Sequence, residues 1–347
     1  MSPPCLVSVI IPTLRRGDLL YRTLDSLLQQ DLPATNLDIL VVENMASADA
    51  PALPGKYGTV RRLLLHDNYG TTGSINRGAS QSQSKYLFLL NDDVELDPGC
   101  ISAMIARSEA APCAFCGGKL LSARQRDHFD GAGDALLLGG GAFRLGHQDP
   151  DTGQYEKEQA VLAGCGAALL FRRDVFQEIG GLDERFFAYL DDVDLCLRAQ
   201  LAGYQGIYVP RAVAYHIGSA TLGDALHPRI VRWMTRNQIY LVLKNYPAPV
   251  LLRLLPRISV FQALWFLLNV KRGRAGPYLM GMAGALGSLF PLLGERRRVM
   301  KRKRISNSEF LSLLRQSERQ LYDWHMQRPK KARSRLMTVY FSLLGRP

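Results

Sequence analysis

The first ninety residues alternate between short apolar runs and segments in which apolar residues recur at helical spacing. The apolar runs are rich in Val, Ile and Leu and have the length of buried strands. They lie at residues 7–12, 37–42, 60–65 and 86–90. Helical spacing is found between them, at residues 18–28 and 73–82. Strands that alternate with helices predict an α/β fold, a doubly wound domain with a mostly parallel sheet.

Polar residues follow closely after three of the expected strands. Glu43 and Asn44 come after the second strand, Asp67 and Asn68 after the third, and residues 91–93 after the fourth. Ligands of such sheets bind beyond the carboxyl ends of the strands. This edge of the sheet is therefore where we expect a ligand site.

Later segments divide the chain into two parts. Residues 131–153 are glycine-rich and irregular, residues 161–171 are expected to form another strand, and residues 173–180 a short helix. Beyond them the composition changes to long apolar runs broken by Arg and Pro. We therefore expect a catalytic domain at residues 1–229 and a helical region at residues 230–347, with the boundary within about ten residues of this point.

The formal net charge of +12 is unevenly distributed. Residues 1–229 hold 20 Lys and Arg against 27 Asp and Glu, whereas residues 230–347 hold 23 against 4. A mildly acidic front part is thus joined to a strongly basic tail. This asymmetry favours contact between the tail and an anionic surface.

The N-terminus and the cysteines indicate neither secretion nor a zinc site. Residues 1–5 carry no basic side chain, and the apolar run after them is too short for a signal peptide, so we expect the catalytic part in the cytoplasm. All six cysteines lie in the front part, without the spacing of a secreted disulfide framework. Cys113 and Cys116 form a C-x-x-C that no second pair completes, and we expect two packed thiols.

The first acidic cluster, at residues 91–95, follows the fourth expected strand. Asp92 and Asp93 stand at the mouth of an apolar strand, where burial without a partner would be costly. A divalent cation, Mg²⁺ or Mn²⁺, would supply that partner, because both prefer oxygen ligands and share their coordination with substrate phosphates. The alternative is a solvated turn rich in Asp, the commoner meaning of an isolated Asn-Asp-Asp.

The second acidic cluster, at residues 186–198, brings Asp191, Asp192 and Asp194 to the start of an expected helix. Acids in a first helical turn are favoured by capping and by the helix dipole, so a purely structural role is the alternative. Asp191 and Asp192 adjoin a hydrophobic stretch, where desolvation would raise a carboxylate pKa toward that of a working general base.

Taken together, these segments resemble glycosyltransferase family 2 with its GT-A fold, and especially the rhamnosyltransferase-like members that build bacterial cell-surface polysaccharides. The similarity rests on motifs in the order of the family and spans residues 6–220. On the donor side, the motifs are the first strand at residues 7–13, V-V-D-N-x-S-x-D at 41–49, N-x-G-x-x-G-x-N-x-G at 68–78 and the D-x-D-like metal motif at 91–93. On the acceptor side, they are G-x-x-x-L-x-R at 164–171 and G-G-F-D-E-x-F-F at 180–187. E-D-x-D-L follows at 191–195.

The resemblance implies a role for the residues at the strand ends. Thr13, Glu43 and Asn68 would line the nucleotide base and ribose. Asp92 would bind the donor diphosphate and, with Asp93, the metal. Glu43 stands where the family has Asp, and its additional methylene leaves the identity of the nucleotide open.

His216 fits the late histidine of the family, which completes the metal shell from across the site. A lone His near a strand end is otherwise more often structural. The family also divides the catalytic domain into a nucleotide-sugar half, about residues 1–97, and an acceptor half, about residues 98–229.

By the same resemblance, Asp192 would be the general base that deprotonates the acceptor hydroxyl as it attacks the anomeric carbon. Attack opposite the leaving diphosphate inverts that carbon, and the metal would stabilise the charge on the leaving phosphate. Asp191 stands where the family has Glu, so the choice of base between these two acids stays open. Gly181, Asp183 and Asp194 would lie on the acceptor side.

The expected reaction is transfer of a sugar from a nucleotide diphosphate donor to a hydroxyl of a lipid-linked or growing glycan, and the resemblance favours rhamnose from a dTDP donor. One alternative is a nucleotidyltransferase-like enzyme, but the turn at residues 13–17 lacks G-x-G or P-loop spacing. Another is a nucleic-acid-binding protein that uses the basic tail. The long apolar runs of the tail argue against it, and we expect no nucleic-acid partner.

Two uncharged runs mark the C-terminal region, at residues 258–270 and 276–294. The first is shorter than the about 20 residues of a spanning helix, and the second contains five glycines and two prolines. Cations flank both runs, with seven Lys and Arg within residues 296–304. Helices in the plane of an anionic membrane surface explain this pattern best, so we expect a peripheral or monotopic protein on the cytoplasmic face of the inner membrane. The alternatives are a helical subdomain packed on the catalytic domain and a membrane span.

Overall fold

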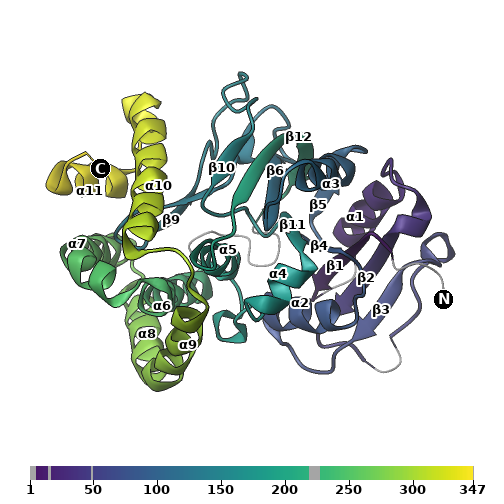
Figure 1. Cartoon of the computed structure of the whole chain (residues 1–347), viewed down its shortest axis with the longest axis horizontal. Coiled ribbons are helices and arrows are strands. Elements are labelled where there is room, and N and C mark those ends of the chain that lie inside the picture. Colours follow the sequence, from purple (N-terminus) through teal and green to yellow (C-terminus); the bar gives the residue numbers. More distant parts are fainter. Residues whose placement is uncertain (1–4, 15–16, 48–49, 219–226, 347) are drawn as a thin grey trace.

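The computed structural model describes residues 5–14, 17–47, 50–218 and 227–346. Asp49, the last residue of the second motif, lies outside these ranges, as do Arg15 and Arg16 of the opening turn. An α/β domain occupies the right of Figure 1 and a group of helices the left.

Within the described residues, ten strands form one sheet in the order β10-β12-β6-β11-β4-β1-β2-β3, with β5 beside β12 and β7 beside β6. The strands are β1 Val7–Thr13, β2 Leu37–Glu43, β3 Arg61–Leu64, β4 Tyr86–Leu90, β5 Val94–Leu96, β6 Phe115–Ser122, β7 Phe129–Gly131, β10 Gln159–Val161, β11 Ala168–Arg172 and β12 Gly206–His216. Strands β3, β2, β1 and β4 are parallel, and β11 runs antiparallel between β4 and β6. The predicted α/β fold is confirmed, with a parallel first half and a mixed second half.

Helices cover both faces of the sheet, as a doubly wound fold requires. They are α1 Asp18–Leu28, α2 Gly70–Ser80, α3 Cys100–Ala110, α4 Arg173–Glu178 and α5 Asp191–Leu201. Val9 and Ile11 of β1 belong to the core that includes α1 and α3, whereas Ile10 belongs to the core of α2, α4 and α5. This separation follows from the period of two in a strand, which turns successive side chains to opposite faces.

Residues 131–153, expected to be irregular, contain the hairpin of β8 Asp134–Leu136 and β9 Ala142–Arg144. Each strand is three residues long, too short to show the alternation by which a strand is recognised in a sequence. The expectation of an irregular segment was therefore wrong for residues 134–136 and 142–144.

Residues 161–171 do not form the single strand that we expected. Between β10 and β11, residues 162–167 leave the sheet as a loop. The backbone N–H of Gly166 in this loop donates a hydrogen bond of 2.8 Å to Asp192 at the start of α5. The loop therefore reaches one of the predicted catalytic acids.

The expected packing of the two C-x-x-C thiols is confirmed. Cys113 and Cys116 are both buried and free, and their sulfur atoms lie 3.4 Å apart.

The C-terminal region consists of helices, some of which pack against the α/β domain while others expose large apolar side chains. They are α6 Pro228–Asn245, α7 Ala248–Lys271, α8 Ala275–Gly287, α9 Leu289–Arg302, α10 Asn307–Gln327 and α11 Arg335–Leu344. Of the described helices, α7 is long and apolar enough to cross a membrane, and α8 with α9 would also qualify if this pair, bent by 64°, were one span.

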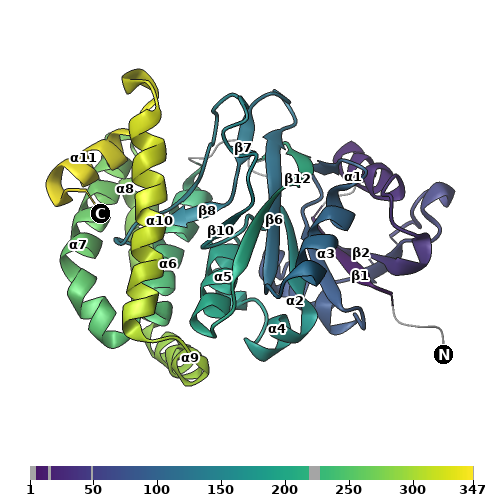
Figure 2. The same cartoon turned by 45° about the horizontal axis from the view of Figure 1, so that its top comes forward.

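The β8–β9 hairpin joins the two parts of the molecule. In Figure 2 the chain around β8 extends from the sheet toward α10. The N–H of Leu138 in the hairpin turn donates to Glu318 Oε1 of α10 at 3.0 Å, and the hydroxyl of Tyr340 donates to the same oxygen at 2.8 Å. Arg257 of α7 donates to Glu318 Oε2 at 3.1 Å. One fully buried carboxylate therefore connects the hairpin with three C-terminal helices.

Replacing Glu318 by Ala should lower the free energy of unfolding by about 3 kcal/mol, because buried donors from three segments lose their acceptor. Urea unfolding followed by circular dichroism measures this change. The matched control is Arg319→Ala, an exposed position on the same helix, where we expect a change below about 0.5 kcal/mol. Equal losses in the two variants would contradict the central role of Glu318.

Candidate active site

The carboxyl ends of β1, β2 and β4 meet at one edge of the sheet because these strands are parallel neighbours. Thr13 at the end of β1 stands beside Glu43 at the end of β2. The hydroxyl of Thr13 donates a hydrogen bond of 2.6 Å to Asp92 Oδ2, just beyond β4. Three of the predicted donor-binding residues are thus brought together.

Glu43 is buried and has a partner that the sequence did not reveal. Arg62 of β3 donates a hydrogen bond of 2.7 Å from its Nε to the Glu43 carboxylate. A buried carboxylate needs such compensation. Arg62 carries no motif of its own, and only the pairing of β3 with β2, which places it opposite Val41, brings it to the site.

The two asparagines near this edge differ in position. Asn68 is exposed, and its Oδ1 accepts a hydrogen bond of 3.0 Å from the N–H of Gly70, which shapes the turn before α2. Asn44 is buried, donates to Ser74 Oγ at 2.6 Å and accepts from the N–H of Tyr69 at 3.0 Å. Asn44 therefore fixes α2 to the end of β2, while contact between Asn68 and a nucleotide stays a prediction.

His216 ends β12, which runs parallel to β6, and lies beside the acids beyond β4. Its Nε2 is 3.3 Å from Asp93 Oδ1, and its Nδ1 is 2.8 Å from Asp130 Oδ2. Burial alone would lower the pKa of His216, but the hydrogen bonds to Asp130 and Asp93 outweigh burial and raise it to about 8. Asp130, in β7, was not predicted as a site residue.

Buried charges surround this histidine. Burial alone would raise the pKa of Asp130, but Arg144 and His216 lower it to about 2. For Asp92 burial dominates, and the pKa is raised to about 6. The site thus holds one firmly ionised carboxylate behind the imidazole and a second carboxyl group whose charge is disfavoured by burial.

Asp92, Asp93 and His216 are the predicted metal ligands, and a cation held by all three stays a prediction. Two carboxylates and an imidazole nitrogen are ligands of the kind that Mn²⁺ and Mg²⁺ accept, and the Asp93 oxygen and His216 Nε2 already face each other. Asp130 on the other ring nitrogen orients the imidazole, as a carboxylate commonly does behind a metal-bound histidine.

The second acidic cluster lies at the start of α5. Asp192 is partly exposed, and its two carboxylate oxygens accept hydrogen bonds of 2.8 Å from the N–H groups of Gly166 and Val193. Asp191 is buried, and burial together with the charge of Asp192 raises its pKa to about 8. The backbone thus orients the exposed acid, and burial disfavours the charge of its neighbour.

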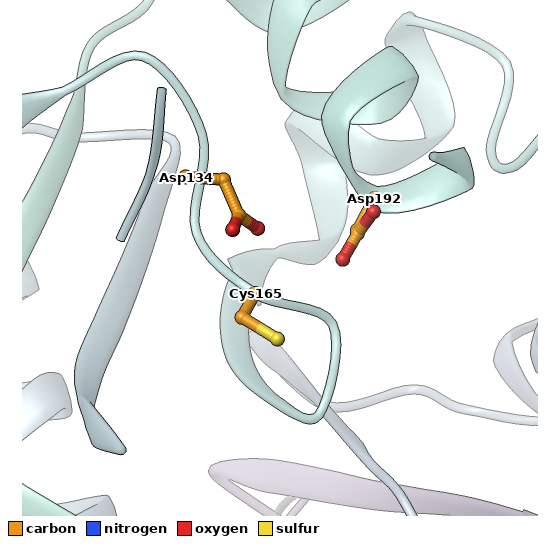
Figure 3. A group of neighbouring side chains, drawn as sticks. All are labelled: Asp134, Cys165 and Asp192. Atoms are coloured by element: carbon orange, nitrogen blue, oxygen red, sulfur yellow. The ribbon is translucent and has the colours of Figure 1, made fainter. Parts of the chain in front are cut away.

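Two further groups reach Asp192 from elsewhere in the sequence. In Figure 3 the side chains of Asp134 from β8, Cys165 from the 162–167 loop and Asp192 point toward one another, with ligand atoms within 4.8 Å. Burial holds the pKa of the Cys165 thiol well above its usual range, and burial with the charge of Asp192 raises the pKa of Asp134 to about 7. A protonated thiol, with the cation of Arg144 nearby, does not suit Mg²⁺ or Mn²⁺.

Asp194, predicted on the acceptor side, is fully buried in a charged network. Its carboxylate accepts hydrogen bonds from Lys244 Nζ at 2.7 Å, Arg198 Nε at 2.9 Å and Asn245 Nδ2 at 2.8 Å. Lys244 and Asn245 belong to α6, so the network ties α5 to the C-terminal region.

Asp183 belongs to the same network, and Gly181 lies close to it in the chain. Asp183 Oδ2 accepts from Lys244 at 2.7 Å and from Arg185 at 2.7 Å, and these partners hold its pKa below the usual range although burial opposes them. Gly181 has a φ of +66°, and a side chain there would meet Asn76 Oδ1 at 2.8 Å. These contacts are structural, and a role of Gly181, Asp183 and Asp194 toward an acceptor stays a prediction.

Comparison with known proteins identifies the family. A family model described as "Glycosyltransferase like family 2" matches residues 3–235. The chain belongs to this family. The predicted family is confirmed.

Similar proteins are found in several bacteria. The chain is 29% identical over 235 residues to the N-acetylglucosaminyl-diphospho-decaprenol L-rhamnosyltransferase of Mycobacterium tuberculosis, covering 61% of this chain and 76% of that protein. It is 33% identical over 236 residues to protein y4gI of Sinorhizobium fredii, with 63% of this chain and 25% of that protein covered. Against the O-antigen biosynthesis protein RfbC of Myxococcus xanthus it is 28% identical, with 66% and 18% covered. The chain thus spans a quarter or less of the last two.

Solved structures show the same fold at low sequence identity. GalNAc-T7 with UDP, GalNAc and Mn²⁺ gives a TM-score of 0.58 at 14% identity over 83% of this chain and 58% of that chain. The Pyrobaculum calidifontis mannosyltransferase PcManGT with GDP-Man and Mn²⁺ gives 0.52 at 13% identity over 93% and 88%. The predicted GT-A fold is confirmed.

Replacing Asp93 by Ala should weaken the Mn²⁺-dependent binding of a nucleoside diphosphate by a factor of about 10 to 100, because the cation loses a carboxylate ligand. Isothermal titration calorimetry with dTDP, UDP and GDP, each with Mn²⁺ and with EDTA, measures the effect. Asp67→Ala removes an exposed carboxylate beyond β3 and should leave binding within about twofold. Equal Mn²⁺-dependent affinity of the wild type and the Asp93 variant would contradict the metal assignment.

Proposed function

We propose that this glycosyltransferase inverts the anomeric carbon of a sugar that it transfers from a nucleotide diphosphate to a hydroxyl of a lipid-linked or growing glycan. The observation that carries the proposal is the contact of Asp93 with His216 next to Asp92, groups of the kind that a cation accepts, together with Asp192, whose carboxylate is partly exposed and oriented by two backbone N–H groups. The name of the mycobacterial relative supports rhamnose as the sugar and a diphospho-polyprenol as the carrier of the acceptor.

The strand ends would bind the donor. Thr13 and Glu43 line the edge beside Asp92, and Glu43 forms an ion pair with Arg62 there. Asp92, Asp93 and His216 would hold the cation, as the Mn²⁺ named for both structural neighbours supports. When bound, this cation neutralises charge on the leaving diphosphate.

Asp192 would act as the general base. Its carboxylate takes the proton of the acceptor hydroxyl while the hydroxyl oxygen forms a bond to the anomeric carbon. The bond from that carbon to the donor phosphate oxygen breaks, and its electron pair leaves with the diphosphate. The bonds from Gly166 and Val193 hold the carboxylate in place for this step, whereas Asp191 is buried.

Replacing Asp192 by Asn keeps the shape of the side chain and removes the base, so transfer should fall by a factor of about 10² to 10⁴. Purified enzyme with Mn²⁺ is screened against dTDP-, UDP- and GDP-sugars and diphospho-polyprenol-linked N-acetylglucosamine, with release of nucleoside diphosphate and glycan mass as readouts. Asp191→Asn is the matched control. A larger loss of transfer in the Asp191 variant would indicate Asp191 as the base. If the wild type transferred sugar from none of these donors, the proposed function would be wrong.

We further propose that the C-terminal helices hold the enzyme on the cytoplasmic face of an anionic inner membrane. Large apolar side chains are exposed on α7, α8 and α9, with Leu252 at 67%, Leu286 at 68% and Phe290 at 85% exposure. Exposed side chains of this size over neighbouring helices favour burial in the acyl boundary of a bilayer. The α7 helix could lie in that boundary or cross it.

The seven Lys and Arg of residues 296–304 divide into two groups. Arg296, Arg298 and Arg304 donate to protein oxygens, of Leu243, Glu295 and Glu178 respectively. Within residues 296–304, the cations with neither a hydrogen bond nor an ion pair to another described residue are Arg297, Lys301, Arg302 and Lys303. An electrostatic anchor would therefore use the second group.

Changing these four cations to Gln should lower affinity for vesicles of phosphatidylglycerol and phosphatidylcholine at least tenfold, since each contributes up to about 1 kcal/mol near an anionic surface. Co-sedimentation at rising salt measures the effect, which should shrink as the charges are screened over about 8 Å at physiological salt. The matched control changes four exposed cations on and after α10, Arg315, Arg319, Lys330 and Lys331. Equal binding of both variants to these vesicles would contradict an electrostatic anchor at residues 297–303.

A further inference from the structure

The backbone just before the two catalytic acids has an unusual conformation. Phe187, Tyr189 and Leu190 have φ values of 65°, 69° and 62°, a region that residues with a side chain rarely adopt. Such conformations persist only where the surroundings impose them, and they cluster at functional sites. Because α5 begins directly after Leu190, the direction of its first acids depends on how this segment is held.

A buried side chain of α6 holds the segment. Asn237 is 0% exposed, and its Nδ2 donates to three carbonyl oxygens, those of Phe186 at 3.1 Å, Ala188 at 2.9 Å and Tyr189 at 2.8 Å. Arg236 donates from one terminal nitrogen to the carbonyl of Phe186 at 2.8 Å and from its Nε to Asn237 Oδ1 at 3.0 Å. The three carbonyls thus converge on one amide group.

The neighbouring turn of α6 contacts the same segment. The indole ring of Trp233 lies 5.2 Å from the ring of Phe187 and 6.2 Å from that of Tyr189, measured between centroids. Burial raises the pKa of Tyr189; the charge of Arg144 opposes this effect, and the charges of Asp191 and Asp93 add to it. Apolar contact and hydrogen bonding from one helix therefore act together on residues 186–190.

We propose that Asn237 is a positioning residue for the base: by binding three carbonyls of residues 186–190, it sets the orientation of Asp192. The proposal rests on the assignment of Asp192 as the base in the proposed function. A shift of about 1 Å in a catalytic group costs a large part of its effect. We call the three hydrogen bonds of Asn237 the clamp. Loss of the clamp should therefore lower the rate of transfer and spare donor binding, because the residues proposed to bind the donor lie on the strand ends.

This assignment makes α6 part of the active site. The motifs that resemble the family end before this helix, and the amino-acid composition of the helix does not indicate a catalytic function. The clamp reaches back about 50 residues, with separations of 51, 49 and 48 between Asn237 and its three partners.

The test compares Asn237→Leu with Asn269→Leu. Asn269, on α7, is also 0% exposed and donates to a single carbonyl, that of Trp265 at 2.8 Å. Both changes replace a buried amide by an apolar side chain with the same number of heavy atoms, so both remove a buried donor and introduce the same larger group. Amide hydrogen exchange of the peptide covering residues 186–192 reports on the clamp without any substrate.

We expect exchange of residues 186–192 to accelerate at least tenfold in Asn237→Leu and to stay within twofold of the wild type in Asn269→Leu. The kcat of transfer should fall at least tenfold in the first variant, with the KM for the donor and the affinity for Mn²⁺ and nucleoside diphosphate within twofold. Asn237→Ser, which keeps one hydroxyl donor, should fall between the wild type and the Leu variant, and it replaces the Leu variant if that chain does not fold.

Two results would overturn the proposal. The first is equal exchange of residues 186–192 in the Asn237 and Asn269 variants, which would make the effect one of general stability. The second is an unchanged kcat despite accelerated exchange, which would separate the clamp from the base. If the wild type transferred no sugar from any donor, the proposed function would fail, and the exchange data would still decide whether Asn237 holds the segment.

Discussion

The burial of Asp194 is the constraint on which the arrangement of the two parts of the chain depends. A carboxylate without contact to water is tolerated only when charges and hydrogen bonds compensate for its lost hydration. Arg198 on the same helix supplies part of that compensation, and Lys244 and Asn245 on α6 supply the rest. Lys244 also binds Asp183, so the start of α5, the segment before it and α6 are held by one set of charges.

This constraint separates acids that look equivalent in the sequence. Asp191, Asp192 and Asp194 lie within four positions, yet the first is buried beside its neighbour, the second is partly exposed and the third is fully enclosed. Their difference comes from helix geometry, because side chains three positions apart on a helix share a face and the residue between them turns away. The face of Asp194 and Arg198 meets α6, and the side chain of Asp192 meets the 162–167 loop.

Local patterns in the sequence were sufficient for the parallel half of the sheet and for the acids at its edge, because apolar runs and the polar residues that end them are neighbours in the chain. They were not sufficient where the partner is distant. Asp130, Asp134 and Arg144 reach the site on three-residue strands in and just before the glycine-rich stretch, and nothing in their local sequence marks them as site residues. Asn237 has no local signal either, since its importance lies in three carbonyls far along the chain.

The packing of the β8–β9 hairpin has a consequence for biosynthesis. The hairpin carries Asp134 and Arg144 at its base, and its turn binds Glu318 and Tyr340, which follow 180 and 201 residues later in the chain. Contacts over such separations form late, and during synthesis they must wait until the later segment has left the ribosome. The hairpin that brings Asp134 toward Asp192 is therefore fixed only after Glu318 and Tyr340 have been made, so a nascent chain that already contains these acids does not yet hold them together.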